Sequence, residues 1–214
     1  MTLLRRALIS ITSAHATLFQ GKETTGVFIS EALHPYKTGT CTPDWHSQQP
    51  GFLNGEDLAT WQDTNSEFRK KLDNMPMAAD IDGSQYGIFY ASAGHAALID
   101  YRTASNLQKI AAQVWANGGI ASAVCHGPAL FANLLDPATN EAIIKGKTIT
   151  GFTTEAEITM GIMEELQPWL GANYTQAQGI WDDHHVVDGR LVTGQNPASA
   201  RSTAQAAVEA FEKL

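Results

Sequence analysis

The sequence predicts an α/β fold with a mostly parallel sheet that is covered by helices on both faces. Strand-like runs alternate along the chain with segments of helical apolar spacing, which is typical of a parallel sheet with crossover helices. The runs 86–92 and 120–124 consist almost entirely of apolar or small residues, as expected for strands buried on both faces. A length of 214 residues with 43% hydrophobic and 17% charged side chains suits one domain with a large core, so we expect a single domain over 1–214.

The elements follow in chain order. We expect strands at 6–12, 86–92, 120–124 and 148–151, and a hairpin over 186–193 that turns at an Asp-Gly pair. We expect helices at 26–33, 67–72, 103–117, 129–135, 154–166 and 199–214. The helix at 103–117 has a clear apolar stripe and ends at a Gly-Gly pair. The segments 13–25, 38–49 and 52–64 are expected to be irregular.

Charge and composition exclude several classes of function. The formal net charge is −8 and no basic stripe is present, which argues against a nucleic-acid partner and against binding to anionic membranes. No apolar run approaches the ~18 residues of a membrane span. The apolar N-terminal run is interrupted by Ser10 and Thr12, so we interpret it as a first buried strand rather than a signal peptide. No phosphate-binding glycine motif occurs, and we expect no cofactor.

The two cysteines, Cys41 and Cys125, lie in unlike surroundings. This favours two free thiols in a reducing compartment, and we expect a cytoplasmic protein, with an additional nuclear fraction left open.

Cys125 is the strongest candidate for chemistry. It lies in the run ASAVCHGPA (121–129), which reads as a buried strand, a sharp turn and a following helix. Such a turn presents a nucleophile at the carboxyl end of a sheet. We expect the helix that follows to lower the pKa of the thiol.

Several residues could assist this thiol. His126 is adjacent and could act as its base, with Glu155 or Glu157 as the acceptor that fixes the imidazole tautomer. Glu31 lies in an apolar segment, where partial burial would raise its pKa and suit it to acid–base work.

A second strand end carries the small residues of the run 91–95. The backbone amides of Gly94, His95 and His126 could form an oxyanion hole there. The polar cluster at 182–185 fits no zinc spacing, so we interpret it as a surface loop and predict no metal site.

Five ordered blocks of sequence resemble a known family. The blocks AVCHGP (123–128) and ASAGH (91–95) resemble the ThiJ/PfpI superfamily. The blocks 25–36, 146–153 and 188–200 narrow the resemblance to its fungal heat-shock-protein-31 type, the glutathione-independent glyoxalase III enzymes. The resemblance spans nearly the whole chain. It implies a flavodoxin-like three-layer α/β/α sandwich and a homodimer.

The resemblance also implies roles for individual residues. Cys125, His126 and Glu157 match the catalytic Cys–His–Glu set of the family, and Glu31 matches its buried Glu beside the thiol. The family pattern therefore favours Glu157 over Glu155. One departure is expected: after Tyr36 roughly fifteen residues are missing relative to the family, about one strand with its connections.

The resemblance implies a cofactor-independent glyoxalase, also called a D-lactate dehydratase, that acts on a small 2-oxoaldehyde. Methylglyoxal and water would give D-lactate through a Cys125 hemithioacetal. Three alternatives remain open at this point. They are a stress-induced holdase chaperone for unfolded client proteins, a cysteine peptidase or amidase, and a redox sensor based on oxidation of Cys125.

Overall fold

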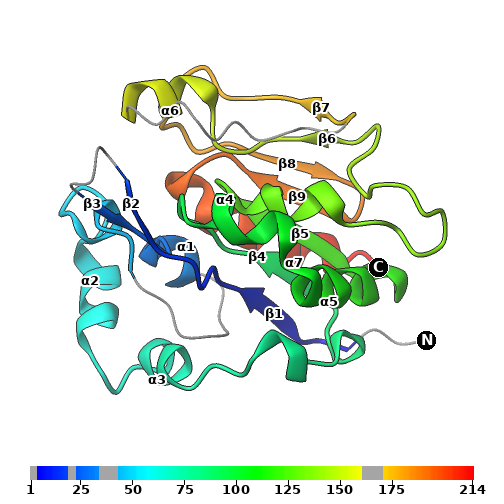
Figure 1. The fold of residues 1–214 in the computed structure, drawn as a ribbon, viewed down its shortest axis with the longest axis horizontal. Coiled ribbons are helices and arrows are strands. Elements are labelled where there is room, and N and C mark those ends of the chain that lie inside the picture. Colours follow the sequence, from blue (N-terminus) through cyan, green and yellow to red (C-terminus); the bar gives the residue numbers. More distant parts are fainter. Residues whose placement is uncertain (1–3, 19–22, 34–42, 161–170) are drawn as a thin grey trace.

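A five-stranded sheet forms the centre of the computed structural model, which describes residues 4–18, 23–33, 43–160 and 171–214 (Figure 1). The strand order is β1-β4-β5-β9-β8. Strands β1 (Ala7–Ser10), β4 (Ile88–Ala91), β5 (Ile120–Val124) and β9 (Leu191–Gly194) run parallel. Strand β8 (His185–Asp188) pairs antiparallel with β9 as the predicted hairpin.

Helices cover both faces of this sheet, as the alternation of strands and helices predicts. Ile88 pairs with Ile120, and both pack toward α7 (Ala200–Phe211). Their neighbours Phe89 and Ala121 belong to the larger core cluster, which includes the buried face of α5 (Ser105–Ala116). Successive strand residues point to opposite faces, so the two helices lie in separate layers, with α5 in front of the sheet and α7 behind it in Figure 1. The predicted α/β/α architecture is confirmed.

The remaining elements surround the sheet. Strands β2 (Ala16–Leu18) and β3 (Glu23–Thr25) lie in the left half of Figure 1 with the helices α1 (Ile29–Leu33), α2 (Gly55–Gln62) and α3 (Glu67–Asp73). Helix α4 (Ala97–Asp100) follows β4 and lies near the centre of the view. A second small sheet pairs β6 (Thr148–Ile149) with β7 (Asn173–Tyr174), and α6 (Thr154–Met160) follows β6. Short 3₁₀ segments occupy His46–Gln48, Ala78–Asp80, Gly83–Gln85, Tyr101–Thr103, Gly127–Asn133 and Pro197–Ser199.

Three local predictions were wrong. The segment 52–64 contains the helix α2. The sequence did not predict it, because none of its residues is buried and a surface helix of this kind needs no apolar stripe. The segment 13–25 holds the antiparallel β2–β3 pair. The helix expected at 129–135 is a 3₁₀ segment, η5 (Gly127–Asn133), in which all residues but the last are buried. Tertiary packing decides its geometry there, and helix propensity does not.

The predicted loss of a strand after Tyr36 falls at residues 34–42, outside the described part of the chain. Within the described part, β1 pairs only with β4 and so lies at the end of the strand order. None of the described helices is both long and apolar enough to cross a membrane.

The topology brings two strand ends to one edge of the sheet. Strands β4 and β5 are parallel neighbours, and Ala91 pairs with Ala123 near their carboxyl ends. The chain leaves β4 toward Gly94 and leaves β5 directly into Cys125. The two small-residue turns therefore lie side by side, at the position where parallel sheets place their ligands.

Candidate active site

Cys125 occupies a strained turn at the end of β5. Its φ is 57°, a left-handed conformation that non-glycine residues rarely adopt, and its side chain is 2% exposed. The Cys125 amide donates to the Gly194 carbonyl at 2.9 Å, and the Cys125 carbonyl accepts from the Phe152 amide at 2.9 Å. These two bonds tie the turn to β9 and to the segment after β6. The neighbouring structure thus holds the sulfur in position against the strain.

His126 and Glu157 complete a chain of polar contacts from the sulfur. The distance from Cys125 Sγ to His126 Nδ1 is 3.1 Å, and the distance from His126 Nε2 to Glu157 Oε1 is 2.7 Å. His126 is fully buried, and Glu157 in α6 is 5% exposed. Glu155 is exposed to solvent, because two residues along a helix turn a side chain toward the opposite face.

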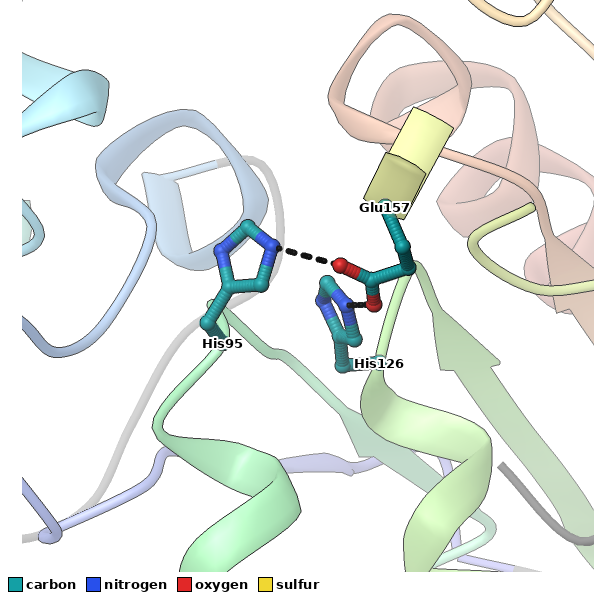
Figure 2. A group of neighbouring side chains, drawn as sticks. All are labelled: His95, His126 and Glu157. Atoms are coloured by element: carbon teal, nitrogen blue, oxygen red, sulfur yellow. Dashed lines mark hydrogen bonds and ion pairs between the residues drawn. The ribbon is translucent and has the colours of Figure 1, made fainter. Parts of the chain in front are cut away.

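A second histidine contacts the other oxygen of the same carboxylate. His95 Nε2 lies 3.3 Å from Glu157 Oε2, and the rings of His95 and His126 are 4.2 Å apart. Figure 2 shows both imidazoles directed at the Glu157 carboxylate. The sequence pattern suggested His95 for its backbone amide, whereas the structure places its side chain in the site.

The protonation of this group follows from its contacts. Burial alone raises the pKa of Glu157, but hydrogen bonds from His126 and His95 outweigh it and lower that pKa to about 2. The carboxylate can only accept, so His126 Nε2 carries the proton and Nδ1 faces the thiol as an acceptor. Burial, with the adjacent His95, lowers the pKa of His126 to about 4. His126 is therefore neutral at neutral pH.

Glu31 contacts Cys125 from α1 and, unlike Glu157, is protonated. The side chain is fully buried in α1, and this burial raises its pKa to about 8. The nearby charge of Asp44 adds to the rise, while hydrogen bonding with Cys125 and with the Ala93 amide opposes part of it. At neutral pH Glu31 is a protonated acid in contact with the nucleophile.

The expectation of a thiol with a lowered pKa was wrong. Burial, reinforced by Glu31, raises the pKa of Cys125 well above its ordinary value, and only the His126 amide counteracts it. The segment that follows is a buried 3₁₀ turn rather than a longer α-helix, so little dipole acts on the sulfur. The thiol is therefore protonated at neutral pH, with His126 Nδ1 as a hydrogen-bond acceptor 3.1 Å from the sulfur.

Gly94 allows two backbone segments to approach each other closely beside the Cys125 site. Its φ is +116°, and a Cβ on it would lie 2.1 Å from the Gly26 carbonyl oxygen. Only glycine fits this close approach between the turn after β4 and the segment before α1. The position brings the backbone at 94–95 up to the Cys125 pocket.

The pocket that reaches Cys125 is small and mainly apolar. Its free volume is about 10 Å³, close to the space that one water molecule requires. Its lining consists of Phe28, His46, Phe52, Gly94, His95, Cys125, Phe152, Met160, Trp181 and Pro197. Phe152 packs on both histidine rings, with centroid distances of 5.5 Å to His95 and 4.6 Å to His126.

Sequence reasoning missed the aromatic lining and the His95 side chain. Phe52 falls in a segment expected to be irregular, and Trp181 precedes the cluster 182–185 that was interpreted as a surface loop. No local pattern distinguishes such residues from ordinary loop aromatics. The one sequence signal for the His95 side chain was its position in a turn of small residues at the end of a strand.

The same residues include a set that could hold a cation. Among the described residues, ligand atoms of His95, His126 and Glu157 lie within 4.8 Å of one another. The carboxylate already accepts from both imidazoles, so a metal would displace those protons rather than fill an unpaired site. No grouping at 182–185 meets the same distance condition in the described part of the chain.

These features define a class of protein: an α/β protein with a buried cysteine at a strand end, a histidine oriented by a glutamate next to that cysteine, and a neutral carboxylic acid beside the sulfur. Comparison with curated proteins and solved structures narrows the class.

No protein-family model matches the chain. The chain is 44% identical to glyoxalase 3 of Candida albicans, over 97% of this chain and 98% of that protein. It is 39% identical to the glutathione-independent glyoxalase HSP31 of Saccharomyces cerevisiae, with the same shares covered. The crystal structure of glyoxalase III from Candida albicans superimposes with a TM-score of 0.94 over 98% of both chains. The protein belongs to the fungal HSP31-type family of glutathione-independent glyoxalases, as the resemblance implied.

The alignments also bear on chain length. The match to the Candida albicans protein extends over 232 positions, more than the 214 residues of this chain. The relative therefore has residues without a counterpart here. The alignment does not locate them, so the loss of a strand after Tyr36 stays a prediction.

Proposed function

We propose that this protein is a glutathione-independent glyoxalase that converts methylglyoxal and water to D-lactate. One observation carries the proposal beyond family membership. A cysteine nucleophile lies between a neutral histidine base, 3.1 Å from its sulfur, and a carboxyl whose pKa is raised to about 8. An intramolecular proton shift beside a covalently held carbonyl needs this combination of groups.

The first step is addition of the thiol to the aldehyde. The Cys125 sulfur attacks C1 of methylglyoxal while His126 Nδ1 accepts the thiol proton. The Glu157 carboxylate, already bonded to His126 Nε2 at 2.7 Å, stabilises the imidazolium that forms. The backbone amides of Gly94, His95 and His126 face the developing oxyanion in this proposal.

The second step moves a proton from C1 to C2. The His126 imidazolium first returns its proton to the hemithioacetal oxygen. Glu31 then donates its proton to the C2 carbonyl oxygen, and either the resulting carboxylate or the neutral His126 removes the C1 proton to give the enediol. The protonated base delivers this proton to C2 and takes up the proton of the C1 hydroxyl as the thioester carbonyl forms. The product is a thioester in which C1 has been oxidised and C2 reduced, so no external oxidant or reductant is required. Water then hydrolyses the thioester to lactate and restores the Cys125 thiol. Glu31, in contact with the sulfur and protonated at rest, suits both directions of this transfer.

The small pocket favours this substrate class over a peptide. With a free volume of about 10 Å³ beside Cys125, an extended peptide would require a larger rearrangement of the lining than methylglyoxal does, so a peptidase or amidase is the weaker assignment. We further infer from the family a homodimer. We also infer a reducing compartment such as the cytoplasm, because the mechanism requires Cys125 as a free thiol.

The direct test is formation of D-lactate from methylglyoxal without glutathione. Purified protein and its Cys125→Ala variant are compared, with circular dichroism on both, and D-lactate is measured with a stereospecific dehydrogenase. We expect product from the native protein only. Folded protein that forms no D-lactate, or equal rates from both forms, would refute the proposal.

A further inference from the structure

Two cavities adjoin at the candidate site and share one wall. The small pocket reaches Cys125, and a second cavity of about 760 Å³ lies beside it. Phe52, Trp181 and Pro197 line both. The larger volume is in the range of ordinary small-molecule sites, whereas the pocket at the sulfur holds little more than a water molecule. Methylglyoxal is much larger than water, so part of this wall must move before substrate can reach Cys125.

The wall consists of aromatic rings in edge contact. Phe52 contacts Phe28 at 5.2 Å and Trp181 at 6.2 Å between ring centroids. Trp181 also contacts Phe152 at 5.8 Å, and Phe152 packs on His126. These contacts form a continuous row from α1 to the catalytic histidine. A ring that leaves the row opens the pocket without disturbing the hydrogen bonds around Cys125.

Trp181 is the ring best placed to move. Its side chain is 41% exposed, so rotation costs little buried area. Its backbone, in contrast, is anchored on both sides. The Asn196 side-chain amide donates to the Ile180 carbonyl at 3.0 Å and to the Asp182 carbonyl at 2.8 Å, and Asn196 is fully buried. The opening motion is therefore a side-chain rotation on a fixed backbone.

We propose that Phe52 and Trp181 form the substrate-size gate of the enzyme, and that the outer cavity receives the carbon substituent of 2-oxoaldehydes larger than methylglyoxal. This rests on the proposed glyoxalase function. The aldehyde carbon reaches Cys125, and an aryl or longer apolar substituent lies against the outer faces of Phe52, Trp181 and Pro197. Substrate size is then limited by the two rings rather than by the polar groups around the sulfur.

The test uses Trp181→Phe, Trp181→Ala and Phe52→Ala in a Cys41→Ser background, which leaves Cys125 as the one thiol. Trp45→Ala is the matched control, since Trp45 is 42% exposed against 41% for Trp181 and lines neither cavity. The first readout is the ratio of kcat/KM for phenylglyoxal to that for methylglyoxal. The second is independent of turnover: the rate of Cys125 alkylation by N-phenylmaleimide relative to iodoacetamide.

We expect Trp181→Ala and Phe52→Ala to raise both ratios by roughly tenfold, because each removes a group of several carbons from the wall. Trp181→Phe should give a smaller rise, and Trp45→Ala should stay within about twofold of the parent. Unchanged ratios in folded Trp181→Ala and Phe52→Ala would overturn the gate. A raised alkylation ratio without turnover of either aldehyde would support the gate and refute the glyoxalase assignment.

Discussion

Two buried glutamates at the Cys125 site differ in charge, since one is neutral and the other is negative at neutral pH. Glu31 in α1 has its pKa raised to about 8, whereas Glu157 in α6 has its pKa lowered to about 2. Both are almost fully buried, at 0% and 5% exposure. Burial acts on both in the same direction, so the difference comes from their partners.

The partners explain the two pKa values. Glu157 accepts from two imidazoles, and these donors favour its charged form. Glu31 faces a thiol and the nearby Asp44 carboxylate, and neither offsets its loss of hydration. Glu157 is therefore an anion bonded to His126, whereas Glu31 carries a proton beside the sulfur. The two carboxyls therefore cannot exchange positions, because only Glu157 is stabilised as an anion and only Glu31 is kept protonated.

The largest expected effect comes from removing the group that both carboxyls serve. Cys125→Ala should lower D-lactate formation by roughly 10⁴-fold or more, because no covalent intermediate can form. Steady-state assay with methylglyoxal, with circular dichroism as the folding control, measures this. Residual activity above about a tenth of the parent rate would mean that the reaction does not require the thiol, and hence that neither glutamate acts through it.

The Glu31→Gln variant tests whether the protonated carboxyl carries the proton between C1 and C2. The amide keeps the shape of the neutral acid but cannot carry a proton between C1 and C2, so we expect kcat to fall by about 10³-fold. Alkylation of Cys125 should continue, since His126 remains the base for the thiol. If Glu31→Gln retained near-parental kcat, His126 alone would be the proton carrier.

Glu157→Gln tests the anionic side. The variant loses the charge that stabilises the imidazolium, and we expect a drop of about 10²-fold in kcat/KM. In contrast to Glu31→Gln, thiol alkylation should slow in parallel with turnover. Parallel slowing in Glu31→Gln and none in Glu157→Gln would reverse our assignment of the two roles.

The two glutamates should affect the free energy of unfolding in different pH ranges. Between pH 4.5 and about 8 the unfolded Glu31 is ionised while the folded one stays protonated. The folded state therefore binds the extra proton, and stability falls as pH rises through this window. Glu31→Gln should remove that slope and be more stable than the parent at pH 8, by up to about 4 kcal/mol. Urea unfolding across this range measures the difference.

Glu157 should act at the acid end. Its folded pKa of about 2 lies below its ordinary value of 4.5, so its contribution is complete above pH 4.5 and is lost as pH falls toward 2. Glu157→Gln should flatten only this acid limb. A parent and variant with the same acid limb would contradict the two imidazole contacts of Glu157.

The smallest expected effect is that of Glu155→Gln, the control for position on α6. Glu155 is exposed, so its replacement should leave activity unchanged and shift the free energy of unfolding by no more than about 0.5 kcal/mol. A loss of activity comparable to that of Glu157→Gln would indicate that α6 is rotated relative to the structure described here.

Local patterns in the sequence predicted much of the fold. Strand β5 was predicted at its observed bounds, because a run of small and apolar residues between turn signals is typical of a doubly buried strand. The Asp-Gly turn located the β8–β9 hairpin in the same way. Helix α2 was missed since nothing in it is buried, and a pattern of burial was the signal being used.

The sequence by itself also determined which residues were candidates for chemistry, since Cys125, His126, Glu31 and a glutamate at 155 or 157 stood out by type and place. Only the tertiary structure decided their states. The neutral thiol, the protonated Glu31 and the ionised Glu157 depend on desolvation and on partners from other elements. The His95 side chain and the Phe52–Trp181 wall come from segments far apart in sequence. The reason is physical: identity and periodicity are local properties, whereas charge state and access depend on what the fold packs around each group.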